Sequence, residues 1–485
     1  MYFGWREVIR IKKLVSKNVL VLLTGTLAVF HAMIALLNDF VEIPAAQTVD
    51  YVLGGITGLY AVLVFSVFRP HLRFSFRTGL LVGLLFCYAV SVAVMSVRYR
   101  TPWFWKNNVQ GLYDTAVLLL AVYSLGCCSG RDGMHPVLRA VLQLCLLAWT
   151  AFMLFVLIRL PQSPVIRLPN GGMIVFRGSQ LYLNCHPNTT GVIAMTALLI
   201  CCFMAYRSKN RVTRGMYMLF ACVHYAVLVL SNSRTMLTAS LIGFAGLTAV
   251  TAYFGFRGKY RLLLTAGAAI LSIAGFWMAR DWVFGIFRTA SMNLGISEVQ
   301  GISEVQWESR QIVDSGFTTL HGRITGFRYA FMAMGDDLQC FLTGVTPPVV
   351  KLALYKTSAG AWNMYTHNQF LEIGVAVGVP AMVCFAVWLL LLGKDCAGRC
   401  RKGGKRREVY DISVILLAFT LANMLEATLL FYGYIISYVF FFMAGWINGI
   451  RGGEINDAEN LEKKTGIGNG SGSLPAVLGG GGGAG

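Results

Sequence analysis

Long apolar runs separated by short polar connections fill most of the chain. Because a helix rises about 1.5 Å per residue, roughly 20 apolar residues cross the ~30 Å hydrocarbon core of a bilayer. Runs close to that length recur along the sequence, so we expect an all-α polytopic membrane protein with about 12 transmembrane helices. The expected spans are 18–37, 51–68, 79–97, 112–128, 137–158, 188–206, 215–230, 235–255, 262–279, 371–393, 412–428 and 430–448.

One polar connection, residues 280–366 between expected helices 9 and 10, is much longer than the others. A connection of that length is seldom idle. It contains GISEVQ twice in tandem, at 295–300 and 301–306, and two copies are too few for a solenoid. Residues 321–334 have helical apolar spacing, as in a helix lying on a membrane surface. We expect four regions: membrane helices 1–9 in 1–279, an external loop carrying acceptor and donor site elements in 280–366, membrane helices 10–12 in 367–450, and a disordered cytoplasmic tail in 451–485.

Composition supports the membrane interpretation. The 485 residues are 56% hydrophobic and 13% charged, whereas soluble domains carry about 25% charged residues. The net charge of +19 does not indicate nucleic-acid binding, because the basic residues lie in short connections between apolar runs, as the positive-inside rule describes. The connection 394–411 is especially basic, so we place it and both termini in the cytoplasm. The run 18–37 follows several basic residues and is too long for a cleaved signal, so we expect a retained first helix.

Polar residues gather where three of the expected helices begin on the outer side. Helix N-termini carry unpaired N–H groups and partial positive charge, which suits anionic ligands. Asn, Ser and Thr also favour these positions simply as caps, and that alternative stays open for each segment. The three segments contain His186 and Asn188, then Ser233 and Arg234, then His367 and Asn368.

Charged residues within or beside the spans narrow the choice. An arginine at position 234 opens an apolar helix on the side where positive charge is disfavoured, so it calls for an anionic partner or for lipid phosphate. Glu372 is an ionisable group near the membrane boundary, which is typical of a functional site. Glu426, at the end of the span 412–428, is another buried-acid candidate; it could equally be a packing polar group paired to a neighbouring helix, which is the interpretation that we favour.

Four short motifs occur in an order that resembles the O-antigen ligase superfamily. The run 365–374, YTHNQFLEIG, is similar to the H-N-x-x-L signature that is followed by a glutamate and glycines. The run 231–237, SNSRTML, resembles the S-x-S-R helix opening. HGR at 321–323 resembles the G-R segment of the external loop, and HPNTTG at 186–191 resembles the polar N-x-x-G opening. The resemblance covers roughly residues 180–395.

This resemblance implies transfer of a glycan from an undecaprenyl-diphosphate carrier to a glycan or lipid acceptor at the outer face of the cytoplasmic membrane. It implies that Arg234 and Arg323 hold the diphosphate and that His367 acts on the reacting sugar. Arg328 is the alternative to Arg323, because the aromatic residues after the G-R motif differ from the usual pattern. The further substrate-binding candidates are Asn368, Glu372, His186, Asn188, Ser233 and Arg328.

The chemistry of such a transfer agrees with these residue types. Guanidinium groups bind phosphate oxygens bidentately, and a histidine has a pKa suited to removing the acceptor's proton. The sequence has no D-x-D pair for a divalent metal, so we expect a metal-independent, inverting glycosyltransferase without a cofactor. Membrane lipids are expected partners, and nucleic acid is not.

Two other classes stay open. A 12-helix polysaccharide flippase or secondary transporter would show an internal repeat of its two halves, which is not visible here. A non-catalytic scaffold of an envelope complex would not need arginines and a histidine facing one cavity. Ligase and polymerase activities cannot be separated from the sequence.

Overall fold

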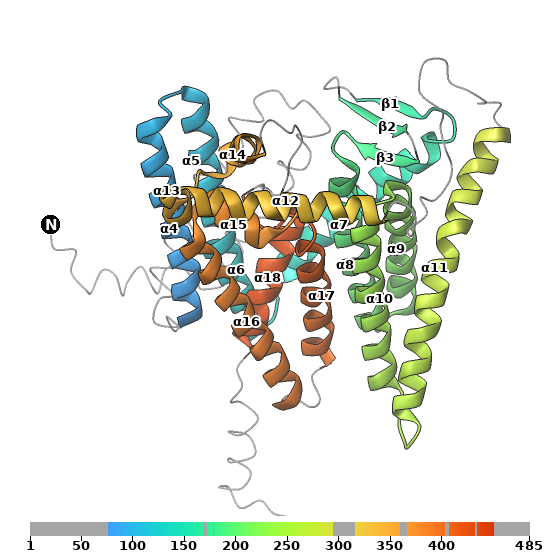
Figure 1. Cartoon of the computed structure of the whole chain (residues 1–485). Coiled ribbons are helices and arrows are strands. Elements are labelled where there is room, and N and C mark those ends of the chain that lie inside the picture. The colour runs from blue at the N-terminus through green and yellow to red at the C-terminus, as the bar shows by residue number, and fades with distance from the viewer. Residues whose placement is uncertain are drawn as a thin grey trace, which may run out of the picture. The chain divides into compact units, whose positions relative to one another are not determined.

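The computed structural model describes residues 76–134, 136–168, 172–177, 179–293, 316–358, 366–402, 407–431 and 434–450. The chain divides into two units, Met1–Ile450 and Arg451–Gly485, and all described residues belong to the first. They are mostly helical (Figure 1). The expected spans 18–37 and 51–68, the GISEVQ duplication and the tail 451–485 lie outside the described residues.

Eight described helices are long and apolar enough to cross a membrane, which confirms a helical polytopic membrane protein. The expected total of 12 and the orientation of the chain stay predictions. Each of the eight matches an expected span. The eight are Phe76–Arg98, Pro102–Gly130, Pro136–Arg159, Pro187–Arg207, Arg211–Ser231, Arg234–Gly255, Arg261–Ala290 and Val379–Arg401.

The helices between Phe76 and Arg159 make up the first three described spans, and all three are apolar. Thr101 caps the second of them, since its hydroxyl accepts from the Phe104 N–H, and Pro102 fits the first turn because that position needs no N–H. A π-helical stretch, η1, then joins two α-helical parts of one span. The bounds are α4 Phe76–Arg98, α5 Pro102–Ala116, η1 Val117–Val122, α6 Tyr123–Asp132 and α7 Pro136–Arg159.

A small antiparallel sheet, which the all-α expectation did not include, connects α7 to the next span. Its strands are β1 (Val165–Arg167), β2 (Met173–Arg177) and β3 (Gln180–Leu183), in the order β1-β2-β3. Ile174 pairs with Leu183 and Phe176 with Leu181, and all four side chains are buried. The strands are too short to stand out from the apolar runs around them. The sheet covers the start of the following helix (Figure 1).

Four long helices follow. The last of them, α11, continues to Asn293, so residues 280–293 extend a helix into the segment expected as an external loop. Few residues of the α11 span are buried, as expected for a helix facing lipid at the edge of a bundle. The bounds are α8 Pro187–Arg207, α9 Arg211–Ser231, α10 Arg234–Gly255 and α11 Arg261–Asn293.

The described part of the expected external loop is largely helical. Its longest helix, α12, runs across the ends of the spanning helices rather than along them (Figure 1). It contains the whole 321–334 stretch for which the sequence predicts a helix on the membrane face. The bounds are α12 Gly316–Asp336, α13 Leu338–Thr343, η2 Pro347–Val349 and α14 Val350–Thr357.

The expected span 371–393 is broken at Gly378. This residue has a φ of +100°, and a Cβ there would lie 2.5 Å from the Leu342 carbonyl oxygen, so only glycine fits. The expected spans 412–428 and 430–448 are two short helices joined by an irregular segment. The bounds are α15 Gln369–Val377, α16 Val379–Lys402, α17 Arg407–Asn423 and α18 Ile435–Gly449.

Two glycine pairs allow α6 and α18 to touch along their backbones. Gly126 and Gly130 face α18, and Gly445 and Gly449 face α6, so that any added Cβ would overlap a backbone atom of the partner helix. This small-xxx-small spacing is a common way for helices to associate in membranes. Nearby, Trp388 of α16 is fully buried against aromatic side chains of α18, which places the core between these helices.

Candidate functional site

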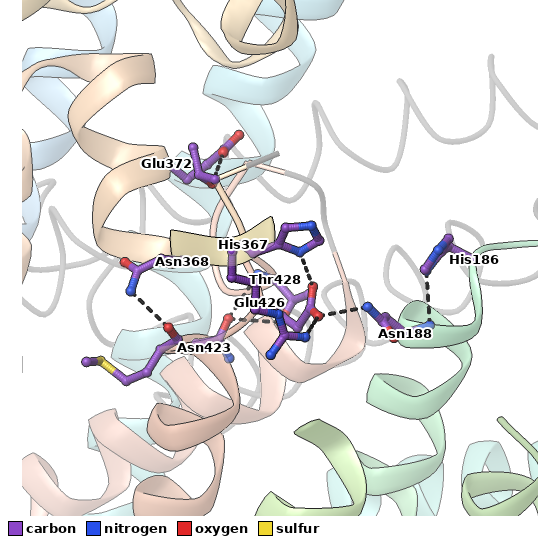
Figure 2. Close-up of polar contacts among 11 residues, drawn as sticks. His186, Asn188, His367, Asn368, Glu372, Asn423, Glu426 and Thr428 are labelled. Atoms are coloured by element: carbon purple, nitrogen blue, oxygen red, sulfur yellow. Dashed lines mark hydrogen bonds and ion pairs between the residues drawn. The ribbon is translucent and has the colours of Figure 1, made fainter. Parts of the chain in front are cut away.

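The carboxylate of Glu426 lies where three separate parts of the chain meet (Figure 2). Arg323 of α12 donates from a guanidinium nitrogen to its Oε1 atom at 2.9 Å, and the Asn188 side-chain amide donates to the same oxygen at 2.7 Å. Nδ1 of His367 lies 3.2 Å from Oε2. Glu426 is only 7% exposed, so its charge depends on these partners rather than on water. We call Glu426, Arg323, His367 and Asn188 the Glu426 cluster.

His367 has a strained backbone. Its φ is +45°, in the left-handed region that few residues other than glycine adopt. The preceding Thr366 is buried, and its hydroxyl donates to Glu372 at 2.5 Å. The Asn368 side chain accepts from the N–H groups of Phe370 and Leu371, which caps α15. Strained residues held by their surroundings often mark functional sites, and the hydrogen bonds on both sides of His367 hold it toward Glu426.

The irregular segment between α17 and α18, which carries Glu426, is itself held by buried amides. Oδ1 of Asn423 accepts from both the N–H and the hydroxyl of Thr428, each at 2.9 Å. Gln369, fully buried at the start of α15, accepts from the Leu429 N–H at 2.7 Å. Asn368 donates to the Met424 carbonyl at 2.9 Å. Because these bonds hold the backbone on both sides, the position of the Glu426 carboxylate is fixed by residues of α15 and α17.

His186 and Asn188 stand together at the start of α8. Nδ1 of His186 accepts from the Asn188 N–H at 3.2 Å and caps the helix, as the capping interpretation predicts. The Asn188 side chain extends from there to Glu426. Burial lowers the pKa of His186 and the nearby His367 lowers it further, while Glu426 acts in the opposite direction. His186 is therefore neutral at neutral pH, and its hydrogen bond with Asn188 connects it to the Glu426 cluster.

The α10 opening packs against the α8 opening. Ser233 lies so close to Gly191, one turn after Asn188, that an added Cβ would approach the serine Cβ to 2.8 Å. Asn232, with a φ of +51°, donates to the Ser179 carbonyl at 3.1 Å and ties this turn to the sheet. The Ser233 hydroxyl is buried and has no hydrogen-bond partner within the described ranges. Arg234 begins α10 at this place and is partly buried.

The remaining candidates lie around this centre in different ways. Glu372 is 5% exposed and contacts Thr366, so it supports the His367 backbone. Arg328 is exposed, and five residues along a helix turn it about 140° away from Arg323. Of the two arginines that the sequence left as alternatives, Arg323 is the one that contacts the cluster. The carboxylate of Asp337 accepts from the Gln339 N–H and caps α13.

Glu426 is the residue whose place the sequence did not indicate. The packing interpretation predicts a partner on a neighbouring helix, and Arg323 of α12 and Asn188 of α8 are such partners. Glu426 differs from the expectation because it lies on an irregular segment rather than on a span, with a histidine at its other carboxylate oxygen. An isolated acid in an apolar stretch was the available signal. The cluster has the parts of an acid–base pair, in which a carboxylate on Nδ1 favours the tautomer that leaves Nε2 as the proton acceptor. It also presents a guanidinium that can bind an oxyanion.

Comparison with protein-family models, with curated proteins and with solved structures finds no match. The residues of the Glu426 cluster and the sequence motifs that contain them are therefore the basis for inferring a function.

Proposed function

We propose that the protein transfers a glycan from an undecaprenyl-diphosphate carrier to a glycan or lipid acceptor at the outer face of the cytoplasmic membrane. The observation that carries the proposal is the contact of one carboxylate with both Arg323 and His367. Arg323 is suited to holding a diphosphate and His367 to removing a proton, and both contact the same carboxylate. Three of the four motifs that resemble the O-antigen ligase superfamily supply a member of the Glu426 cluster.

The proposed reaction has one displacement step. The acceptor hydroxyl oxygen attacks the anomeric carbon, the bond from that carbon to the diphosphate oxygen breaks, and the electron pair leaves with the diphosphate. Nε2 of His367 takes the hydroxyl proton, while Glu426 stabilises the imidazolium that forms. Attack from the face opposite the leaving group inverts the anomeric centre.

The arginines stabilise the charge that develops on the leaving diphosphate. Arg323 contacts the Glu426 carboxylate, and Arg234 begins α10, whose first residues pack against the start of α8. Fixed donors aimed at developing charge commonly supply the largest part of a rate enhancement. The N-termini of α8 and α10 add partial positive charge. These groups make a divalent metal unnecessary in the proposed mechanism.

A transport function is the second candidate. The break between α15 and α16 at Gly378 is of the kind that transporters use at their binding sites, so a polysaccharide flippase or secondary transporter is the alternative. A flippase would move a lipid-linked glycan between leaflets without changing it, whereas a transferase would release undecaprenyl diphosphate.

The experiment that separates them uses purified protein in phospholipid vesicles with a lipid-linked glycan donor and a glycan acceptor. The unsubstituted protein should lengthen the acceptor glycan and release one undecaprenyl diphosphate for each glycan transferred. The His367→Ala variant, present in the membrane at equal abundance, should form neither product. Movement of intact donor across the bilayer without either product would contradict the transferase proposal. Deleting the gene and identifying which cell-surface glycan loses length or attachment would distinguish polymerase from ligase activity.

A further inference from the structure

An apolar crevice lies between α7 on one side and α6, α8 and α18 on the other. Its volume is about 230 Å³. On α8 it extends from Ile193 to Met204, so it begins more than a turn beyond Asn188 and continues away from the Glu426 cluster. Among the described spanning helices, α7 packs chiefly against α9, which leaves the crevice open beside it. An unfilled void of this size would deprive its walls of dispersion contacts.

The walls are suited to hydrocarbon. Nearly all of the exposed surface in the crevice is apolar, and three of its polar side chains, Gln143, Tyr217 and Thr196, already form hydrogen bonds within the protein. The Gln143 amide donates to the Tyr217 hydroxyl at 2.7 Å, and Thr196 donates to the Val192 carbonyl at 2.8 Å. Water would find few hydrogen bonds there, whereas an acyl chain would recover the missing contacts.

The crevice has the depth of one leaflet. From Ile193 to Met204 a helix rises about 16 Å, close to half of the ~30 Å hydrocarbon core. On α7 the lining residues run from Leu138 to Trp149, in the half of the helix nearest its start. The crevice therefore occupies the leaflet at which α7 begins and α8 ends.

That end of the molecule is positively charged. Arg139 lines the crevice near the start of α7, and its side chain is exposed. Arg211 and Arg214 lie in the first turn of α9 at the same end, whereas Arg207 and Arg407 there are already paired with Glu408 and Asp411. A guanidinium at the level of the headgroups binds lipid phosphate while its stem stays in the apolar layer. The charge thus complements an anionic headgroup.

We propose that this crevice binds one anionic glycerophospholipid, with an acyl chain between α7 and α18 and its phosphate at Arg139. The occupant follows from the apolar walls, the one-leaflet depth and the arginine at the headgroup level. The site is separate from the Glu426 cluster and does not depend on the proposed transfer reaction.

Two tryptophans that line the crevice, Trp149 and Trp446, provide a direct test. Trp149 is only 7% exposed, so a lipid reaches it through the crevice. Full-length protein is placed in phosphatidylcholine vesicles that contain a small fraction of phosphatidylglycerol with brominated acyl chains. We expect saturable quenching that Trp149→Phe and Trp446→Phe each reduce. The control Trp282→Phe, at a position 68% exposed on α11, should lose only the quenching that rises in proportion to brominated lipid.

The charge requirement has its own test. Arg139→Gln should lower the preference for brominated phosphatidylglycerol over brominated phosphatidylcholine by about five-fold, the factor that one arginine near a membrane surface supplies. Arg159→Gln, at the other end of α7, should leave this preference unchanged. Ala197→Phe, which adds a ring to the crevice wall, should abolish the saturable component.

Quenching of Trp149 that is no stronger than that of Trp282 and does not saturate would overturn the proposal. So would crosslinks from a photoreactive residue at position 142 to residues 1–75, because the crevice would then be filled by the chain itself. Equal quenching by both brominated lipids in the unsubstituted protein would also overturn the assignment of the phosphate to Arg139.

Discussion

Nδ1 of His367 lies 3.2 Å from Oε2 of Glu426, although 59 positions separate the two residues in the chain. Both residues lie outside regular helix, one immediately before α15 and the other between α17 and α18. The side-chain amides of Asn368 and Gln369 bond to the backbone of the segment that carries Glu426, so they hold the two residues at this distance. The expected effects of changing this pair, its supports and its neighbours follow from the contacts described above.

Glu426→Gln should lower kcat for glycan transfer by roughly 10²-fold or more, the lower range for loss of general base catalysis. The glutamine amide can donate to Nδ1 of His367, which places the remaining proton on Nε2 and removes the base. KM for the lipid-linked donor should not rise, because Arg323 is released from a competing carboxylate. Steady-state kinetics would measure both constants.

Glu408→Gln is the matched control, since Glu408 forms an exposed ion pair with Arg207 far along α8 from Asn188. It should change neither constant. A Glu426→Gln protein with full kcat would contradict the proposed acid–base pair.

Arg323→Lys should raise KM for the donor and lower kcat, because a single ammonium cannot replace a bidentate guanidinium. The same reasoning applies to Arg234→Lys. Arg328→Lys should have little effect, since that side chain is exposed and turned away from the cluster. Transfer assays on the three variants show whether Arg323 or Arg328 binds the diphosphate. If Arg328→Lys were the damaging change, the assignment of Arg323 would be wrong.

Asn423→Ala should destabilise the protein by about 1–3 kcal/mol, because it leaves the buried N–H and hydroxyl of Thr428 without their acceptor. Thermal unfolding in detergent would measure the loss. Asn107→Ala is the control, because Asn107 bonds to the Trp103 carbonyl on an exposed face and should change stability by less than about 0.5 kcal/mol. Equal stability of the two variants would show that the Glu426 segment is not held by Asn423.

Acidification should destabilise the protein through His186. Its pKa in the folded protein is lowered, chiefly by burial, so the unfolded chain binds the proton more readily. The contribution of His186 to stability is complete above about pH 6.5 and decreases as the pH falls below that value. His186→Asn keeps a side-chain acceptor for the Asn188 N–H and removes the titration. The variant should therefore lose less stability than the parent protein between pH 7 and pH 5, as measured by unfolding temperature.

Transfer should proceed in EDTA, since arginines and helix N-termini supply the positive charge that a metal would otherwise provide. Purified protein with donor and acceptor would be assayed with chelator and after addition of magnesium or manganese. Activity that is lost in EDTA and restored by either metal would refute this mechanism and direct attention to Asp336 and Asp337.

The sequence by itself determined the class of protein and the places where helices begin. Apolar length and periodicity are local properties, so each of the eight helices in the described residues that are long enough to cross a membrane overlaps an expected span. The starts of α8 and α15 are predictable from the sequence because capping chemistry is also local, and His186 and Asn368 cap these helices. A continuous apolar run does not reveal an interruption whose cause is tertiary, and the break at Gly378 depends on the nearby Leu342 carbonyl.

Only the tertiary structure decided which side chains share a site. Arg323 and Glu426 are 103 positions apart, and the choice between Arg323 and Arg328 depends on which face α12 turns toward the irregular segment after α17. The place of Glu426 depends on hydrogen bonds from Gln369 and Asn368, which lie on another helix opening. Such contacts form because buried polar groups must find partners once the helices pack, and that requirement is met in space rather than along the chain.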